Sequence, residues 1–506
     1  MFMIKPLGKI VIVGGGTAGW VAASMLANHL AKPDHSPSSV KIELIESAEI
    51  GTIGVGESTI PPFLEMLTNL GINQQDFVKY TQGSFKLGIQ FDNWLRKGES
   101  YFHPFGTITA GMNEQIFFQM WLKSAHKGDK FGLQDFSPCN IMAKHRRFYL
   151  PQLLENSPVS EARYALHLDA KLVADYLRQY AEARGVVRTE GKVVEVLQRD
   201  DGAIASVVLA SGETVAADFF VDCSGFRALL IEKTLGSTYR DWTHYLPCDR
   251  AIATQIEKID ETVPFTRATA ADYGWIWRIP LQRRIGTGYV YASQYCSDDE
   301  ALSTLKATLD GKVLLEPRVV PFRTGVRNEI WKKNCISVGL ASGFIEPLES
   351  TAIHLTVRGM VHLLRNFPDK DCDPALINQY NRRMITEYEE IRDFIVLHYC
   401  MTEREDTAFW RWCKNMELPP SLKDTMDYYK VQGGLPDMID ALFHSVNWRS
   451  VAEGMGVRPR KYCPLVEEMD YESTKRMMLD YAETMEAYVK KLPSQDQFIR
   501  DNCSAY

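Results

Sequence analysis

A glycine-rich run near the N-terminus has the spacing that binds a dinucleotide. Gly14, Gly16 and Gly19 form a G-x-G-x-x-G motif between a β-branched run and a run of good helix formers. The first glycine permits a tight turn, the second lets the backbone approach a pyrophosphate, and the third lets the helix pack closely on the strand. Thr17 and Ala18 lie at the start of that helix, where unpaired N–H groups bind phosphate. We therefore expect a bound nucleotide here.

An acidic residue ends the next predicted strand. Residues 40–46 alternate in polarity and end in Glu46, 27 residues after the last motif glycine. A carboxylate at this place accepts hydrogen bonds from ribose hydroxyls, so FAD or NAD is favoured over NADP. The chain has later strand and turn segments at 218–225 and 338–340, which favour the extended FAD. It has no second G-x-G-x-x-G that would mark an NAD(P)H domain.

Three further segments carry residue types suited to chemistry beside such a nucleotide. A glycine strap, Gly51–Pro62, follows the acid closely enough to cover a flavin. Trp275 and Trp277 alternate in the sequence W-x-W-x-I-P, so both indoles face one side of a strand. Glu349 precedes Ser350 and a predicted helix, whose first N–H groups attract anions. We expect Ser350 to cap that helix.

These segments resemble the flavin-dependent halogenases, typified by the tryptophan halogenases. The W-x-W-x-I-P motif, the strap G-x-G-V-G-E-S-T, the K-L-G-I-x-F segment at 86–91 and E-P-L-E-S-T occur in family order, and the resemblance covers nearly the whole chain. It implies an α/β fold with a Rossmann-like FAD-binding body of the flavin monooxygenase type, an additional β-sheet and a helical C-terminal cap.

The resemblance also implies a two-step reaction. Reduced FAD, O2 and a halide (bromide or chloride) give hypohalous acid, which passes through the protein to a lysine beside a free aromatic substrate of the indole or tryptophan type. A separate NAD(P)H-dependent flavin reductase supplies FADH2, in agreement with the missing second nucleotide motif. Family members are often dimers, so we expect a homodimer.

Two residues are the catalytic candidates. By resemblance, Lys86 captures or orients the oxidant, and Glu349 activates it or takes the ring proton. Apolar neighbours flank Lys86, so we expect lost hydration to lower its pKa. Without the resemblance, a surface lysine that extends its charged end into solvent would be the preferred interpretation. Glu346 competes with Glu349, which we prefer because the family's acid stands immediately before Ser-Thr.

The resemblance assigns the other site residues as well. The backbone amides of Thr351 and Ala352 hold the halide, although the family usually has Gly in place of Ala352. His103 and Phe105 flank the substrate ring, and Trp275 and Trp277 separate the flavin from the substrate. The cofactor contacts are expected at Gly14, Gly16, Thr17, Ala18, Gly19, Glu46, Gly56, Glu57, Ser58, Val193, Leu340 and Ile353.

Other functions stay open at this point. A flavin monooxygenase could hydroxylate the substrate directly, and a halogenase could act on a phenolic or carrier-bound pyrrole substrate. A flavoprotein without turnover is a third class. Tyr428-Tyr429 matches the tyrosine pair with which tryptophan halogenases clamp the amino acid, but the next acid is Asp437, so we assign no clamp.

Composition narrows the partners. The 506 residues are 45% apolar and carry a net charge of −7, which disfavours nucleic acid and anionic membranes. The ten cysteines include no C-x-x-C pair, so we expect neither a metal site nor a disulfide framework. No signal peptide or stretch of about 18 apolar residues is evident, so we expect a cytoplasmic protein.

The segments predict two parts. Residues 1–370 form the FAD-binding body, with substrate-side insertions at about 86–165 and 250–325. Residues 371–506 form the helical cap, which contributes to the substrate pocket. Helices are expected at 166–185, 374–400 and 473–491.

Overall fold

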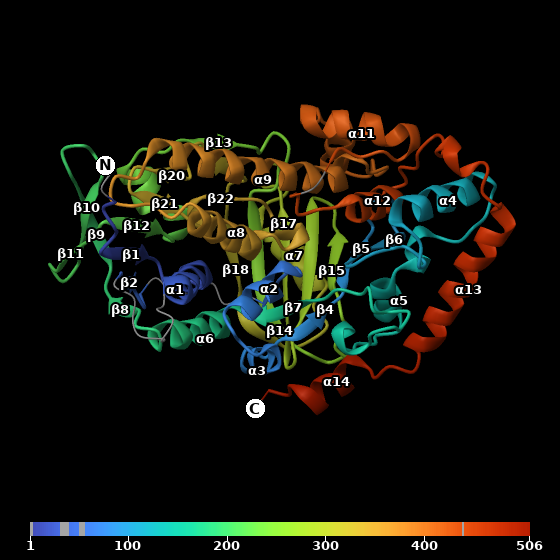
Figure 1. Cartoon of the computed structure of the whole chain (residues 1–506), viewed down its shortest axis with the longest axis horizontal. Coiled ribbons are helices and arrows are strands. Elements are labelled where there is room, and N and C mark those ends of the chain that lie inside the picture. Colours follow the sequence, from blue (N-terminus) through green and yellow to red (C-terminus); the bar gives the residue numbers. More distant parts are fainter. Residues whose placement is uncertain (1–3, 31–39, 50–55, 438–439, 506) are drawn as a thin grey trace.

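The computed structural model describes residues 4–30, 40–49, 56–437 and 440–505. A six-stranded sheet lies at one end of the molecule, in the order β20-β21-β12-β1-β2-β8 (Figure 1). The five strands from β21 to β8 pair in parallel, and β20 is antiparallel to β21. These strands are β1 (Lys9–Val13), β2 (Lys41–Glu46), β8 (Val187–Glu190), β12 (Phe219–Asp222), β20 (Trp331–Lys332) and β21 (Cys335–Ser337). Helix α1 (Thr17–Leu30) connects β1 and β2, so the predicted βαβ unit is confirmed.

A seven-stranded sheet forms the middle of the molecule, in the order β18-β14-β17-β16-β15-β5-β6. The expected second sheet over 250–325 is therefore present. It also takes strands from 88–104, because β5 pairs in parallel with β15. Its strands are β5 (Gly88–Asp92), β6 (Ser100–Pro104), β14 (Arg250–Glu257), β15 (Thr266–Ala270), β16 (Gly274–Pro280), β17 (Arg284–Tyr291) and β18 (Val313–Pro321).

Three small sheets complete the β-structure, in the orders β3-β7-β4, β11-β10-β9 and β13-β19-β22. Their strands are β3 (Gly56–Ser58), β4 (Ser84–Lys86), β7 (Ala165–Asp169), β9 (Val193–Gln198), β10 (Ile204–Leu209), β11 (Thr214–Ala216), β13 (Tyr239–Asp241), β19 (Gly325–Arg327) and β22 (Gly343–Phe344).

The helix expected over 166–185 begins later than predicted. Residues 165–169 are the fully buried strand β7, which pairs with both β3 and β4. Helix α6 (Ala170–Glu182) starts only after Asp169, whose side chain accepts hydrogen bonds from the N–H groups of Lys171 and Leu172. That cap marks the change from strand to helix.

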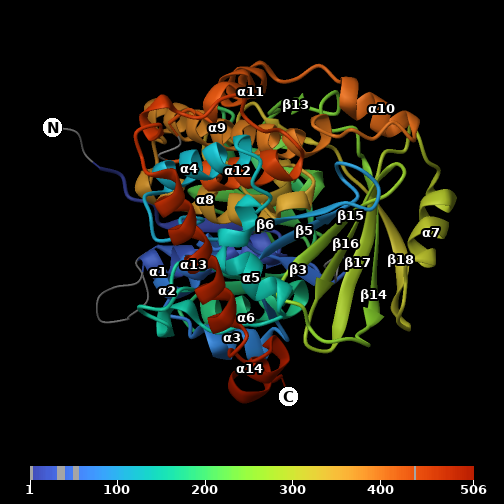
Figure 2. The ribbon, with the colours of Figure 1, turned by 90° about the vertical axis from the view of Figure 1, so that its right-hand side faces the viewer.

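The C-terminal part of the chain is mainly helical, as expected, and covers one side of the central sheet (Figure 2). Helix α9 (Pro374–Cys400) has the predicted bounds, and α13 (Tyr471–Val489) begins two residues earlier than expected. The remaining helices are α2 (Pro62–Asn69), α3 (Gln74–Tyr80), α4 (Glu114–His126), α5 (Pro138–Lys144), α7 (Asp298–Ala307), α8 (Ala352–Arg365), α10 (Ala408–Asn415), α11 (Pro420–Gln432), α12 (Ser445–Gly454) and α14 (Gln495–Asn502). Within the described ranges, no helix has the length and apolarity needed to cross a membrane.

Candidate active site

The glycine motif forms a turn that leaves room on one side only. Gly14 has φ +120°, and a Cβ there would lie 2.2 Å from the carbonyl oxygen of Cys223. A Cβ on Gly19 would lie 1.8 Å from the carbonyl oxygen of Gly14, so helix α1 touches the turn. A Cβ on Gly16, in contrast, meets no atom within 4 Å. The open side at Gly16, beside the first turn of α1, fits the pyrophosphate of FAD.

Glu46 stands at the end of β2, against this turn. A Cβ on Gly15 would lie 1.6 Å from its Oε2, so the carboxylate occupies the space beside the glycine backbone. Its Oε1 accepts a 2.5 Å hydrogen bond from Arg188 on β8. The position fits the predicted contact with a ribose hydroxyl. The arginine partner was not predicted.

The other predicted cofactor residues lie on separate elements. Gly56, Glu57 and Ser58 form β3, and burial raises the pKa of Glu57 to about 7. The part of the strap at 51–55 lies outside the described residues. Ile353 is buried in the first turn of α8. Its contact with FAD, like those of β3, stays a prediction.

Leu340 and Val193 lie on two elements near the glycine motif. Leu340 belongs to a single 3₁₀ turn, Gly339–Ala341, which follows β21. A Cβ on Gly339 would lie 2.8 Å from the Cβ of Ala18, so this turn abuts the start of α1. Val193 opens β9 in the small outer sheet. It packs against the hydrophobic cluster that contains Val11 and Val13 of β1, the strand that leads into the motif.

Lys86 is the last residue of β4 and is fully buried. Its Nζ donates hydrogen bonds to the carbonyl oxygen of Thr59 at 3.1 Å and to Ser350 Oγ at 3.0 Å, and lies 5.1 Å from the centre of the Phe105 ring. Burial lowers its pKa to about 7, and the charge of Glu349 opposes this shift. The predicted lowering is confirmed, and the alternative of a surface lysine is wrong.

Glu349 is equally buried and lies between two imidazoles. His103 Nδ1 is 2.9 and 3.0 Å from its two carboxylate oxygens, and His398 Nε2 is 3.0 Å from Oε1. Burial alone would raise the pKa of Glu349, but His103 and His398 together lower it to about 2. The group is therefore a carboxylate at any working pH, suited to accept a proton from a strong acid.

The orientation of His103 is set by the cap of helix α12. Asn447 Oδ1 accepts a hydrogen bond from the backbone N–H of His444 at 2.8 Å, so its amide nitrogen faces His103 Nε2 at 3.0 Å. Because Nε2 accepts this bond, Nδ1 carries the hydrogen that His103 donates to Glu349. The sequence pattern marked neither Asn447 nor His398.

The expected cap of α8 was placed one residue too early. Ser350 has φ +60° in the left-handed region and uses its hydroxyl to accept from Lys86. Thr351 is the N-terminal flanking residue, and α8 begins at Ala352. Thr351 is fully buried, and its Oγ1 has no hydrogen-bond partner among the described residues. The unpaired first-turn N–H groups of this 14-residue helix and that hydroxyl fit a halide ion.

The two tryptophans of the W-x-W-x-I-P motif lie side by side on β16. The ring centres of Trp275 and Trp277 are 6.2 Å apart, as the strand periodicity predicts. Trp275 donates from Nε1 to Glu346 at 3.3 Å, and burial raises the pKa of that carboxyl to about 7. Glu346 therefore supports the tryptophan wall, whereas Glu349 contacts His103.

Aromatic rings surround the Glu349 and Lys86 pair. The ring of Phe394 on α9 lies 5.5 Å from His103, and Phe443 stacks on Phe394 at 3.8 Å. Trp448 contacts Phe394 edge-on at 5.2 Å. With Phe105, these rings form an apolar, aromatic place beside His103 and Lys86.

Other aromatic residues of the cap belong to the protein core. Phe409 and Trp410 are fully buried and pack on Tyr399. Tyr429 is buried while Tyr428 is half exposed, so the two do not form a paired clamp. This agrees with leaving the tyrosine pair unassigned.

Comparison with known proteins gives a consistent result. The model of the tryptophan halogenase family matches residues 9–471. The tryptophan 7-halogenase RebH of Lentzea aerocolonigenes is 34% identical, with 98% of this chain and 99% of RebH covered.

Two solved structures are more similar still. Xcc4156, a flavin-dependent halogenase from Xanthomonas campestris, has a TM-score of 0.94 at 40% identity and covers 99% of each chain. BrvH, a flavin-dependent halogenase from Brevundimonas sp. BAL3, has a TM-score of 0.93 at 38% identity, covering 98% of this chain and 99% of its own.

Proposed function

Because the chain belongs to the tryptophan halogenase family, we propose that it halogenates a free indole-type ring held beside Lys86. It is a flavin-dependent halogenase that uses FADH2, O2 and a halide. The observation that carries the proposal is the fully buried amine of Lys86. This amine lies over the ring of Phe105 and donates a hydrogen bond to Ser350, the residue that follows Glu349.

Reduced FAD, when bound, supplies hypohalous acid from O2 and halide. The glycine turn at Gly16 and the carboxylate of Glu46 would hold the nucleotide, and the start of α8 would hold the halide. The wall of Trp275 and Trp277 keeps the organic ring away from the flavin. A separate flavin reductase would supply the reduced cofactor.

Two proton transfers take place at the substrate, one from Lys86 and one to Glu349. The Lys86 ammonium donates its third N–H to the oxygen of hypohalous acid, since Thr59 and Ser350 accept the other two. The ring carbon forms its bond to the halogen as the halogen–oxygen bond breaks, and the lysine proton converts the departing hydroxide into water.

The Glu349 carboxylate then takes the proton that the halogenated ring carbon releases. His103 and His398 keep it ionised and in place. A proton passed back from Glu349 to Lys86 along the Ser350 hydroxyl restores both groups. The sum is one ring C–H and one hypohalous acid converted into one carbon–halogen bond and one water.

The test is a bromination assay with FAD, a flavin reductase, bromide and indole, followed by mass spectrometry. We expect a product that has gained bromine and lost hydrogen. A product that has gained only oxygen would instead identify a hydroxylating monooxygenase. Lys86→Ala should abolish bromination while FAD binding, measured by fluorescence titration, is retained.

A further inference from the structure

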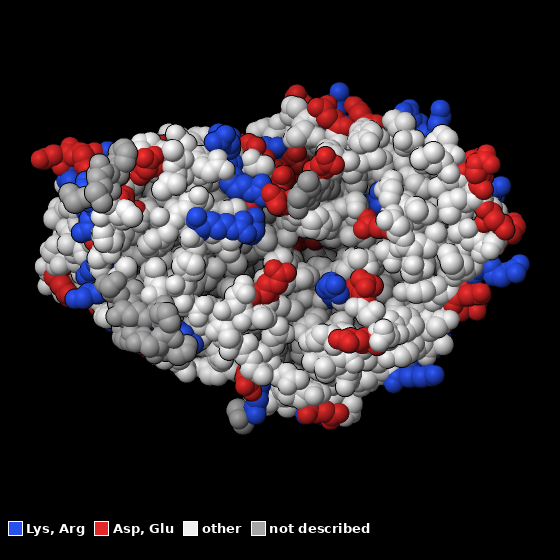
Figure 3. Space-filling model, in the orientation of Figure 1, with Lys and Arg blue, Asp and Glu red and all other residues white. Residues whose placement is uncertain are grey.

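A groove of about 570 Å³ runs beside helices α2 and α8, outside every residue assigned to the halogenation site. Figure 3 shows the hollowed face on which it lies. Residues of α1, α2, α8 and α9 and of the segment 440–444 line it. Its volume is that of a small-molecule site, which is roughly 300–1,000 Å³.

One end of the groove adjoins the aromatic place described above. Leu442 and His444 line the groove, and Phe443 between them stacks on Phe394 at 3.8 Å beside His103. The same short segment therefore contacts both the groove and the aromatic place.

Two other segments also contact both the groove and the residues of the halogenation site. Ile391 lines the groove one helical turn before Phe394 on α9. Pro62 lines it at the start of α2, three residues after Thr59, whose carbonyl oxygen accepts from Lys86. These three segments place the groove next to the residues around Lys86 and His103.

The groove extends away from the halogenation site along α8. His354, three residues after Thr351, lines the near part, and Arg365 lines the far end. At 1.5 Å per helical residue these two positions are roughly 16 Å apart. An extended peptide of about five residues has this length, at about 3.3 Å per residue.

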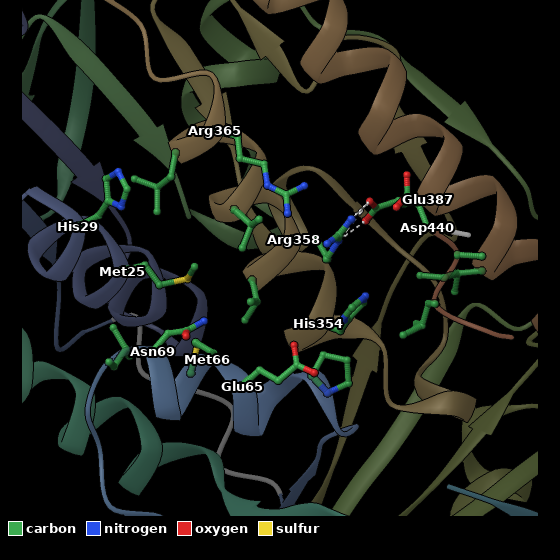
Figure 4. Close-up of a pocket in the computed structure, with 18 of the residues that line it drawn as sticks. Met25, His29, Glu65, Met66, Asn69, His354, Arg358, Arg365, Glu387 and Asp440 are labelled. Carbon is green, nitrogen blue, oxygen red and sulfur yellow. Dashed lines mark hydrogen bonds and ion pairs between the residues drawn. The ribbon is translucent and has the colours of Figure 1, made fainter. Parts of the chain in front are cut away.

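Charge is distributed unevenly along the groove. The acidic residues Glu65 and Glu390 lie toward the halogenation site, and the basic residues His29 and Arg365 lie at the far end. Of these four, the two acids and Arg365 form no ion pair with any described residue. Figure 4 shows His29 at one end and Asp440 at the other. An occupant with a cation near the ring and an anion at its far end matches this pattern.

The middle of the groove carries a polar group without a partner. His354 is 8% exposed, and its Nδ1 makes no hydrogen bond to any residue in the described ranges. An amide of an occupant's backbone would supply one. Arg358, beside it, is already paired with Glu387 at 2.6 Å.

We propose that the groove binds the tail of a short peptide, about four to five residues long, whose N-terminal tryptophan is the halogenated residue. The α-ammonium would lie near Glu65 and Glu390, and the C-terminal carboxylate near Arg365. Free tryptophan fits less well because its own carboxylate would lie among the acids. This inference depends on the proposed halogenation of an indole-type ring beside Lys86.

The first experiment compares substrates with the FAD-loaded enzyme and a flavin reductase. Indole, tryptophan and the peptide Trp-Ala-Ala-Ala-Ala are brominated separately, and peptide binding is measured independently by calorimetry. We expect kcat/KM for the peptide to exceed that for tryptophan at least about tenfold. N-terminal acetylation and C-terminal amidation should each lower it several-fold.

The second experiment blocks the groove. Val361 lines it between Arg358 and Arg365 and lies ten residues after the halide-binding Thr351. Val361→Trp should lower kcat/KM and affinity for the peptide about tenfold and leave indole bromination within about twofold. Val361→Ala, the matched control, should affect neither substrate.

The outcomes separate the two proposals. Bromination of indole without preference for the peptide, or equal loss with both substrates in Val361→Trp, would overturn the peptide inference and leave the halogenase function intact. Failure to brominate any indole would overturn the proposed function, and the peptide inference with it.

Discussion

The amine of Lys86 donates a 3.0 Å hydrogen bond to the hydroxyl of Ser350, the residue that follows Glu349. This bond links the proposed general acid to the residue next in the chain to Glu349, the proposed general base. Both charged groups are fully buried, so each depends on the other and on its fixed neighbours to stay ionised.

The pH dependence of halogenation should report Lys86. Its pKa of about 7 lies below the usual value because of burial, so the reactive ammonium is lost as the pH rises through about 7. The ratio of halogenated product to hypohalous acid formed should fall about tenfold for each pH unit above that point. Trapping the oxidant with a dye separates this step from the flavin reaction.

Two observations would test whether Lys86 causes this pH dependence of halogenation. Lys86→Arg keeps its charge at every accessible pH, so its residual activity should lack the decline. A rate that instead rises with pH through 7 would show that the neutral amine reacts, and proton donation by Lys86 would be wrong.

Removing the Ser350 hydroxyl should interrupt the proton return. We expect Ser350→Ala and Ser350→Gly each to lower halogenation about 100-fold while hypohalous acid production, measured by the dye, continues. The pair should differ in stability, because φ is +60° at this position. Glycine there should be about 1 kcal/mol more stable than alanine in thermal unfolding. Unchanged halogenation in both variants would exclude the relay.

His398 should keep Glu349 ionised in acid. Burial would raise the pKa of Glu349, but His103 and His398 lower it to about 2. The folded state is therefore stabilised by these contacts above pH 4.5, and this stabilisation is lost as the pH falls through about 2. In His398→Leu the pKa rises, and halogenation should decline as the pH is lowered from about 7 to 5. The wild type should not decline over this interval, because Lys86 becomes fully protonated as the pH falls below about 7.

The control for this prediction removes the titrating group itself. Glu349→Gln has no carboxylate, so its residual activity should show no acidic decline. An identical acidic limb in Glu349→Gln and His398→Leu would assign the limb to another residue.

Local spacing was sufficient to predict the nucleotide-binding unit and the strand position of Trp275 and Trp277, because turns and strand alternation depend on neighbouring residues. The burial of Lys86, in contrast, was indicated by the family resemblance, because the residue taken alone fits a surface lysine. The start of α6 and the cap of α8 were wrong because pairing of β7 and the bond from Lys86 to Ser350 come from distant parts of the chain.

The partners of Glu349 were beyond the reach of sequence patterns. Asn447 contacts His103 although the two are 344 residues apart in the chain. His398 lies in the middle of a long amphipathic helix, where a histidine has no distinctive spacing. Only the packing of α9 and α12 against β6 brings these side chains to one carboxylate.

Two motif glycines should separate folding from cofactor binding. Gly14→Ala places a Cβ 2.2 Å from the carbonyl oxygen of Cys223 at φ +120°, and should lower the free energy of unfolding by about 1–3 kcal/mol. Gly16→Ala meets no protein atom within 4 Å, so the cofactor-free protein should unfold within about 0.5 kcal/mol of the wild type. Its affinity for FAD should fall, because the methyl group occupies the side open to the pyrophosphate. Thermal unfolding of the cofactor-free proteins and fluorescence titration with FAD measure the two effects, and normal FAD affinity in Gly16→Ala would place the pyrophosphate elsewhere.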